Sequence, residues 1–149
     1  MDLAFPSHTT YDSNHQSPLI LGVDDNEDNL LLLTHIMQCM GCNLITANNG
    51  NDVLSLVKDY QPDLILLDII LPGLNGIEVI EQLKGDEATK NIPIIAVTGF
   101  ANPEKCNYLL NIGCQGCIIK PYLIEQLESL VFKLVKKQRS LITAKSSVH

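Results

Sequence analysis

Polar side chains suited to phosphoryl chemistry follow short apolar runs at four places in this chain. Asp24 and Asp25 follow the first of these runs, and Asp68 follows the second. Thr98 ends the third run, and Lys120 comes directly after the fourth. Runs of this kind are typical of buried strands, so each polar residue stands where a strand would stop. If the strands are parallel, these side chains meet at one edge of a sheet, where they can hold a divalent cation and accept a phosphoryl group.

Strand and helix patterns alternate over the chain from residue 18 to residue 138. The expected strands are Leu19–Val23, Leu44–Ala47, Asp63–Leu67, Ile92–Val97 and Cys117–Ile119. The expected helices are Glu27–Met40, Asp52–Tyr60, Gly76–Lys84, a helix opened by Asn102-Pro103 that stops at Gly113, and about Leu123–Lys137. Apolar strands that alternate with helices predict a parallel sheet covered on both faces. The fold class is therefore α/β, a doubly wound sheet of five strands in the order 2-1-3-4-5.

Ligands of such sheets bind beyond the carboxyl ends of the strands, at the point where the strand order reverses. In the predicted order this point lies between the first and third strands, which end next to Asp24, Asp25 and Asp68. Neighbouring strands are about 4.8 Å apart, so Asp25 and Asp68 can share one magnesium ion. Lys120 and Thr98 are then close enough to contact a phosphoryl group on Asp68.

The order and spacing of these residues resemble the receiver domain of two-component response regulators. The matching elements are Asp24-Asp25, Asp68 with Leu71-Pro72-Gly73 and Asn75-Gly76, Val97-Thr98-Gly99, and Lys120-Pro121. The resemblance covers about residues 18–137 and implies the flavodoxin-like (βα)5 fold of CheY-like proteins. It further implies that Asp68 is the phosphoacceptor. Asp25 would be the direct magnesium ligand, Asp24 its partner, and the backbone carbonyl of Ile70 a further ligand.

The resemblance implies that Thr98 and Lys120 sense the phosphoryl group. Receivers usually carry an aromatic residue three positions before the lysine, which swings inward as the threonine moves. Here that switch position is Cys117, which is too small to act as such a lever. The sequence therefore predicts an intact acceptor site with altered output coupling.

Composition limits the classes of partner. A net charge of −7 argues against binding to nucleic acid or an anionic membrane. Residues 133–149 carry five basic residues and no acid, so residues 1–132 hold five basic and 17 acidic residues, a net charge of −12. No secretory signal or membrane-spanning run is visible, which favours the cytoplasm. Five cysteines form no disulfide framework.

The pairs Cys39/Cys42 and Cys114/Cys117 invite comparison with a zinc site. In the predicted strand order they lead into opposite edge strands, roughly 19 Å apart at about 4.8 Å per strand. We therefore predict that they bind no shared zinc. Ordinary reduced cysteines are the favoured interpretation, and a redox pair is the alternative.

The domain organisation is expected to be a flexible arm over residues 1–17, a receiver over 18–138, and a flexible tail over 139–149. On the first helix Leu31 lies opposite the buried stripe. On the last helix Phe132 lies on the polar side, opposite a buried stripe formed by Leu123, Leu127, Leu130, Val131 and Leu134. Leu31 and Phe132 are thus candidates for a partner surface, although scattered apolar surface residues are common.

We expect a stand-alone receiver, phosphorylated on Asp68 in a magnesium-dependent reaction by a histidine kinase or a histidine phosphotransfer protein. It would signal by binding an unknown downstream protein or by passing the phosphoryl group on. It is not expected to be an enzyme with a turnover substrate. One alternative is a degenerate receiver that acts as a phosphorylation-independent interaction module. Another is an aspartate-nucleophile phosphatase, which Ile70 disfavours because such enzymes commonly place a second acid at that position.

Overall fold

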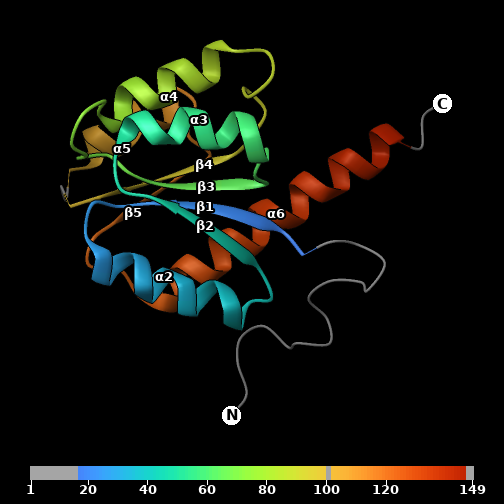
Figure 1. Ribbon diagram of the computed structural model, residues 1–149, viewed down its shortest axis with the longest axis horizontal. Coiled ribbons are helices and arrows are strands. Elements are labelled where there is room, and N and C mark those ends of the chain that lie inside the picture. The colour runs from blue at the N-terminus through green and yellow to red at the C-terminus, as the bar shows by residue number, and fades with distance from the viewer. Residues whose placement is uncertain (1–16, 100–101, 147–149) are drawn as a thin grey trace.

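The computed structural model describes residues 17–99 and 102–146, with side chains up to residue 138. Within these residues five strands alternate with five helices, as predicted (Figure 1). The strands are β1 (Leu19–Val23), β2 (Asn43–Ala47), β3 (Leu64–Asp68), β4 (Ile94–Thr98) and β5 (Gly116–Ile119). The helices are α2 (Glu27–Cys39), α3 (Gly50–Tyr60), α4 (Gly76–Gly85), α5 (Pro103–Asn111) and α6 (Ile124–Ser146).

All neighbouring strands pair in parallel, in the order β2-β1-β3-β4-β5. This confirms the predicted doubly wound topology. The register also aligns the carboxyl ends of the central strands, because Val23 of β1 pairs with Leu67 of β3. The next residue of each strand is an aspartate, so Asp24 and Asp68 leave the sheet side by side.

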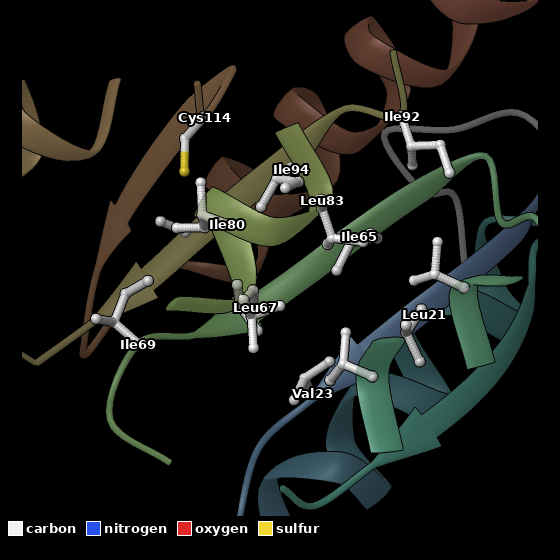
Figure 2. Close-up of a cluster of buried hydrophobic side chains, with 14 of the residues drawn as sticks. Leu21, Val23, Ile65, Leu67, Ile69, Ile80, Leu83, Ile92, Ile94 and Cys114 are labelled. Atoms are coloured by element: carbon white, nitrogen blue, oxygen red, sulfur yellow. The ribbon is translucent and has the colours of Figure 1, made fainter. Parts of the chain in front are cut away.

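Helices cover both faces of the sheet. Figure 1 shows α3, α4 and α5 on one face and α2 and α6 on the other. Successive strand residues point to opposite faces, so Leu21 and Leu67 pack on the α3–α5 face (Figure 2) while Ile20 and Leu66 pack against the other pair of helices. Burial on both faces explains why the strands are continuous apolar runs.

Asparagine caps begin four of the helices. Each cap side chain accepts a hydrogen bond from a backbone N–H two or three residues later, which satisfies a donor that has no partner within the helix. The caps are Asn26, Asn49, Asn75 and Asn102. Asn26 and Asn75 follow the strands that end in Asp24 and Asp68, so these two caps fix the turns that lead away from the predicted site.

Helix α6 is longer than predicted. It ends at Ser146, nine residues beyond the expected end at Lys137, because residues 138–146 contain no glycine or proline to stop it. The segment 139–146, expected to belong to a tail, therefore has a helical backbone. The predicted arm over residues 1–17 lies outside the described residues except for Ser17.

Two apolar residues near α6 differ from the sequence pattern. Leu123 is 71% exposed instead of buried, because the helix begins only at Ile124. Phe132 is partly buried against the core cluster on this face instead of standing on a polar side. The ammonium of Lys136 lies 5.9 Å from the centroid of its ring.

In the part of the chain that the structure describes, no helix combines the length and the apolar character needed to cross a membrane.

Candidate functional site

The three predicted carboxylates converge at the carboxyl edge of the sheet. Asp68 is the last residue of β3, and Asp24 and Asp25 directly follow β1. Asp24 and Asp68 are buried, whereas Asp25 is exposed. One oxygen from each carboxylate lies within 4.8 Å of the others. The switch point of the sheet therefore holds a compact acidic cluster that is accessible through Asp25.

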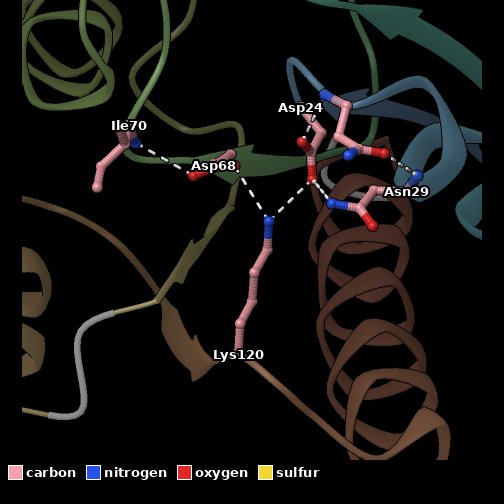
Figure 3. A network of polar contacts seen from close by, with 6 residues as sticks. Asp24, Asn29, Asp68, Ile70 and Lys120 are labelled. Atoms are coloured by element: carbon pink, nitrogen blue, oxygen red, sulfur yellow. Dashed lines mark hydrogen bonds and ion pairs between the residues drawn. The ribbon is translucent and has the colours of Figure 1, made fainter.

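Lys120 joins the two buried carboxylates (Figure 3). Its Nζ donates to Oδ2 of Asp24 at 3.0 Å and to Oδ2 of Asp68 at 3.1 Å. The lysine reaches them from the end of β5, where its backbone N–H donates to the carbonyl of Thr98 at 2.7 Å. The ends of β4 and β5 are thus tied together directly beside the acids.

Backbone and side-chain donors orient each buried carboxylate. Asp24 Oδ1 accepts from the backbone N–H of Asn26 at 2.9 Å, and its Oδ2 accepts from the side-chain amide of Asn29 at 3.0 Å. Asp68 Oδ1 accepts from the backbone N–H of Ile70 at 3.1 Å. Asn29 is a contributor that the sequence interpretation missed. Its position in the first turn of α2, five residues after Asp24, was the available signal.

Burial dominates the electrostatics of Asp68. Desolvation raises the pKa of its carboxyl, an effect that the hydrogen bond and charge of Lys120 and the N–H of Ile70 oppose and that the charge of Asp24 reinforces. For Lys120, burial acts to lower the pKa, but the hydrogen bonds and charges of Asp24 and Asp68 outweigh it and raise the pKa above its ordinary value. Lys120 therefore remains an ammonium ion at neutral pH.

The donor set fits a hard divalent cation. With all three acids ionised, the carboxylates carry −3 and Lys120 carries +1, which leaves the cluster with a net charge of −2. Carboxylate and carbonyl oxygens are the ligands that magnesium prefers, together with water. Exposed Asp25 and buried Asp68 are suited to hold such an ion.

The other predicted residues lie around this cluster. Thr98 ends β4 and is fully buried. Cys117 lies on β5, where its Sγ is 2.7 Å from the Sγ of Cys106 on α5. It therefore faces a helix and not the acids. Leu31 is 58% exposed on α2, as the helical pattern predicts.

A cavity of about 360 Å³ lies beside Asp24 and Lys120. Much of its remaining wall is apolar side chains of α2, of the segment leading into α6 and of α6 itself, among them Leu32, Tyr122 and Ile124. The polar edge of the sheet therefore adjoins an apolar surface between α2 and α6.

Comparison with known proteins identifies the family. The response regulator receiver domain matches residues 20–132. This chain belongs to the response regulator receiver family. Among curated receivers, the polar-differentiation response regulator DivK of Brucella anthropi is 39% identical over 102 residues, which are 68% of this chain and 83% of the relative. DivK of Brucella ovis matches over the same shares of the two chains.

Solved receiver domains share the fold. The receiver domain of a signal transduction histidine kinase from Syntrophus aciditrophicus has a TM-score of 0.75 and 28% identity, over 81% of this chain and 92% of that one. The receiver domain of a putative LuxO repressor from Vibrio parahaemolyticus has a TM-score of 0.80 at 20% identity, over 89% of this chain and 99% of that one. A receiver domain of a Pseudomonas aeruginosa sensor histidine kinase, solved with magnesium coordinated in its active-site cleft, has a TM-score of 0.74 at 23% identity, over 80% and 98% of the two chains.

Proposed function

We propose that this receiver is a phosphorylation switch that accepts a phosphoryl group on Asp68 from a phosphohistidine donor. The observation that carries the proposal is the position of the Asp68 carboxylate. It lies 3.1 Å from an ammonium ion and within 4.8 Å of two further carboxylates. A structural aspartate needs no such surroundings, whereas an acceptor needs an adjacent cation and a cation-binding partner set.

The transfer is a displacement at phosphorus. An oxygen of ionised Asp68 forms a bond to the phosphorus atom while the bond from phosphorus to the donor's imidazole nitrogen breaks. The nitrogen keeps the electron pair and takes up a proton, and Asp68 becomes an acyl phosphate. Burial keeps water away from the carboxylate, and the N–H of Ile70 on Oδ1 holds its orientation.

Lys120 and Thr98 stabilise the charge that develops during transfer. The Lys120 ammonium already contacts Oδ2 of Asp68, so it is placed to bind an oxygen of the phosphoryl group. The hydroxyl of Thr98, at the end of the neighbouring strand, is assigned to a second oxygen through a charge-assisted hydrogen bond. Thr98 ends β4 and Lys120 directly follows the adjacent strand β5, so phosphorylation changes the contacts at the ends of both strands.

Magnesium is the cofactor of this proposal. Asp25, Asp68 and the backbone carbonyl of Ile70 would hold it, with Asp24 acting through a bound water. When bound, the ion neutralises the carboxylates and withdraws charge from the phosphoryl oxygens. The net charge of −2 in the cluster supports a divalent ion over a monovalent one.

The donor protein is a histidine kinase or a histidine phosphotransfer protein, and we place its docking surface beside the acceptor. Leu31 and Leu32 of α2 are 58% and 45% exposed, and Leu123 and Ile124, at the start of α6, are 71% and 43% exposed. They lie on the elements that border the acidic cluster. Phe132, which is half-buried, contributes less to such a surface. The downstream step is binding of a further protein or passage of the phosphoryl group.

The proposal gives the protein no turnover substrate. The Asp68 acyl phosphate is lost slowly to water, and the residue two positions later is Ile70, whose side chain cannot act as the general acid of a phosphatase. The cytoplasm is the compartment that fits, because the ATP that charges histidine kinases is found there.

A phosphorylation assay tests the proposal. Wild type is treated with acetyl phosphate or a phosphorylated histidine kinase, with and without magnesium, and hydroxylamine-sensitive labelling is measured. Asp68→Asn should abolish labelling, whereas Asp59→Asn, an exposed acid at the end of α3, should leave it unchanged. Equal labelling of wild type and Asp68→Asn would reject the assignment. Absence of labelling in all variants with every donor would favour the phosphorylation-independent interaction module.

A further inference from the structure

Two cysteines meet between α5 and β5, outside the acidic cluster. The Sγ atoms of Cys106 and Cys117 are 2.7 Å apart. Cys106 lies on α5, three residues before the fully buried Leu109, so it shares the face of that helix that packs on the sheet. Cys117 lies on β5, where it pairs with Ala96 of β4. Both side chains are partly exposed.

Little movement separates this contact from a covalent bond. A disulfide has an S–S distance of about 2.05 Å, so the two sulfur atoms need to approach by less than about 1 Å. The helix and the strand that carry them are already packed together, and neither element has to unfold for the sulfurs to meet. The other three cysteines differ: Cys39 is exposed at the end of α2, and Cys42 and Cys114 are buried.

The surroundings of Cys117 favour its uncharged state. Burial, followed by the hydrogen bond and charge of Cys106 and the charge of Cys114, raises the pKa of the Cys117 thiol to about 12. A thiolate is therefore disfavoured at this position, whereas a disulfide carries no charge to desolvate. Cys117 also packs against the core cluster on the α3–α5 face, where an apolar S–S group is readily accommodated.

We propose that Cys106 and Cys117 form a reversible disulfide, an oxidation site that tethers α5 to β5. The proposal goes beyond phosphorylation of Asp68 and does not depend on it. In a reducing compartment such a bond is transient and senses oxidation, as cytosolic disulfides commonly do.

The bond forms by exchange with a small disulfide such as glutathione disulfide. The Cys106 thiolate attacks one sulfur of the reagent, the reagent's S–S bond breaks, and the leaving thiolate takes a proton. Cys117 then loses its proton and attacks the Cys106 sulfur, which releases the second thiol. The protein loses two electrons and two protons, and the reagent is reduced to two thiols. Cys106 attacks first because the raised pKa of Cys117 makes its thiolate scarce.

The tether crosses the face on which receivers usually move. Cys117 is three residues before Lys120, at the switch position. In the reduced protein no covalent cross-link joins α5 to β5 apart from the connecting residues 112–115. In the oxidised protein the two elements move as one unit. Oxidation therefore makes the α5–β5 face more rigid, whatever the state of the acceptor site.

Thiol mapping tests the site. Full-length protein is equilibrated with reduced and oxidised glutathione at increasing oxidised fraction, quenched with acid, alkylated and digested. We expect labelling of Cys106 and Cys117 to fall together, a peptide cross-linked between them, and a mass lower than that of the reduced protein by two hydrogen atoms. Cys114 lies in the connection between α5 and β5. It should remain a free thiol under the same conditions, so that it is fully alkylated once the protein is unfolded.

Variants separate the proposed bond from other oxidation. Cys39→Ser should leave the Cys106–Cys117 cross-link unchanged, whereas Cys106→Ser should remove it and leave Cys117 reduced or in a mixed disulfide. The Asp68→Asn protein should form the bond as wild type does, which keeps this test independent of phosphorylation. Cross-links that run mainly through Cys39 or between two chains would overturn the proposal. So would full labelling of Cys106 and Cys117 at every glutathione ratio.

Discussion

The acceptor edge and the α5–β5 face are built on different principles, although Lys120 and Cys117 stand only three residues apart. Lys120 ends in an ion-pair network with two buried carboxylates at 3.0 and 3.1 Å. Cys117 ends against the thiol of a neighbouring helix. The first region is charged, and the orientation of its two buried carboxylates is fixed by several donors at once: backbone N–H groups, an asparagine amide and an ammonium ion. The second is apolar and held by packing.

This difference separates reception of the signal from its transmission. The residues proposed for phosphoryl transfer lie in the positions that the receiver pattern predicts. The position that usually transmits the change is occupied by a small thiol. A switch needs a two-state element and an interaction that differs between its states. In this receiver a large inward-swinging side chain cannot be that element, so we expect the acceptor edge to respond strongly and the α5–β5 face weakly.

The largest expected effect is loss of the metal site at the acceptor edge. Asp25→Asn should reduce magnesium-dependent phosphorylation by about 100-fold or more, since changing even a residue that only orients a metal ligand commonly costs about 10- to 100-fold in binding or activity. Asp28→Asn removes the same charge from an exposed position of α2 and should change the rate little. Initial rates with acetyl phosphate over a magnesium titration measure both variants. Equal magnesium dependence in Asp25→Asn and wild type would remove Asp25 from the site.

Steric substitution should next distinguish a crowded position from an open one at the acceptor edge. A Cβ added at Gly76 would lie 2.6 Å from the Cα of Ile69 and 3.0 Å from the carbonyl oxygen of Asp68. Gly76→Ala should therefore displace the segment after Asp68, destabilise the protein by about 2 kcal/mol or more and slow phosphorylation. A Cβ added at Gly99 meets no atom of the described residues within 4 Å, so Gly99→Ala should change stability by less than about 0.5 kcal/mol. Urea unfolding compares them, and similar losses in both variants would contradict the close packing at Gly76.

Charge at Asp68 should have a smaller effect on stability. The raised pKa of Asp68 means that the native state binds more protons than the unfolded state between the ordinary value of 3.8 and the native value. Stability therefore falls as pH rises through this window, and the ionised side chain is unfavourable at neutral pH. In magnesium-free buffer Asp68→Asn should stabilise the protein by about 1 kcal/mol at neutral pH.

The pH dependence and added metal check this prediction. The stability difference should shrink as the pH falls toward 3.8, because protonated aspartic acid and asparagine are then both neutral. Magnesium should stabilise wild type more than the variant, since a ligand that binds only the native state raises its stability. A destabilised Asp68→Asn protein in metal-free buffer at neutral pH would show that the Lys120 ion pair outweighs the burial of the charge.

The smallest expected effect is at the α5–β5 face itself. On addition of beryllofluoride and magnesium to reduced protein, backbone amide shifts should be large over residues 68–76 and in α2, and small in α5 and β5. Thr98 should still move toward the phosphoryl mimic. Large shifts concentrated over residues 105–119 and 123–136, with the acceptor loop and α2 quiet, would overturn the separation of reception from transmission.

Much of this structure follows from the sequence for identifiable reasons. The strand order and the meeting of Asp24, Asp25 and Asp68 come from a parallel sheet whose register is fixed by apolar strands buried on both faces. Lys120 joins them because it follows the strand that lies two positions from β3 in the sheet order. These features are consequences of the topology, and the hydrophobic periodicity and the turn residues of the sequence predict that topology well.

Other features depend on tertiary packing that no local pattern specifies. The contact between Cys106 and Cys117 depends on how α5 is rotated about its axis as it packs on β5. Its partial signal is the three-residue spacing from Cys106 to Leu109. Leu123 continues the apolar period of α6 but precedes the first helical residue, so the pattern extends where the helix does not. Helix α6 continues to Ser146 because residues 138–146 contain no glycine or proline to end it. The polar composition of this segment led to its prediction as a tail.

The course of α6 also separates charge across the molecule. The helix begins beside the acidic edge and runs away from it past the end of the sheet (Figure 1), and Lys133, Lys136 and Lys137 are exposed along it. Lys137 lies roughly 20 Å along the axis from the first helical residue, at about 1.5 Å per residue. The receiver is thus an electric dipole, negative at the acceptor edge and positive at the far end of α6. The field of a charged partner would orient the receiver before the two proteins touch and so raise their association rate. This gain should fall as added salt shortens the Debye length, which is about 10 Å at 0.1 M.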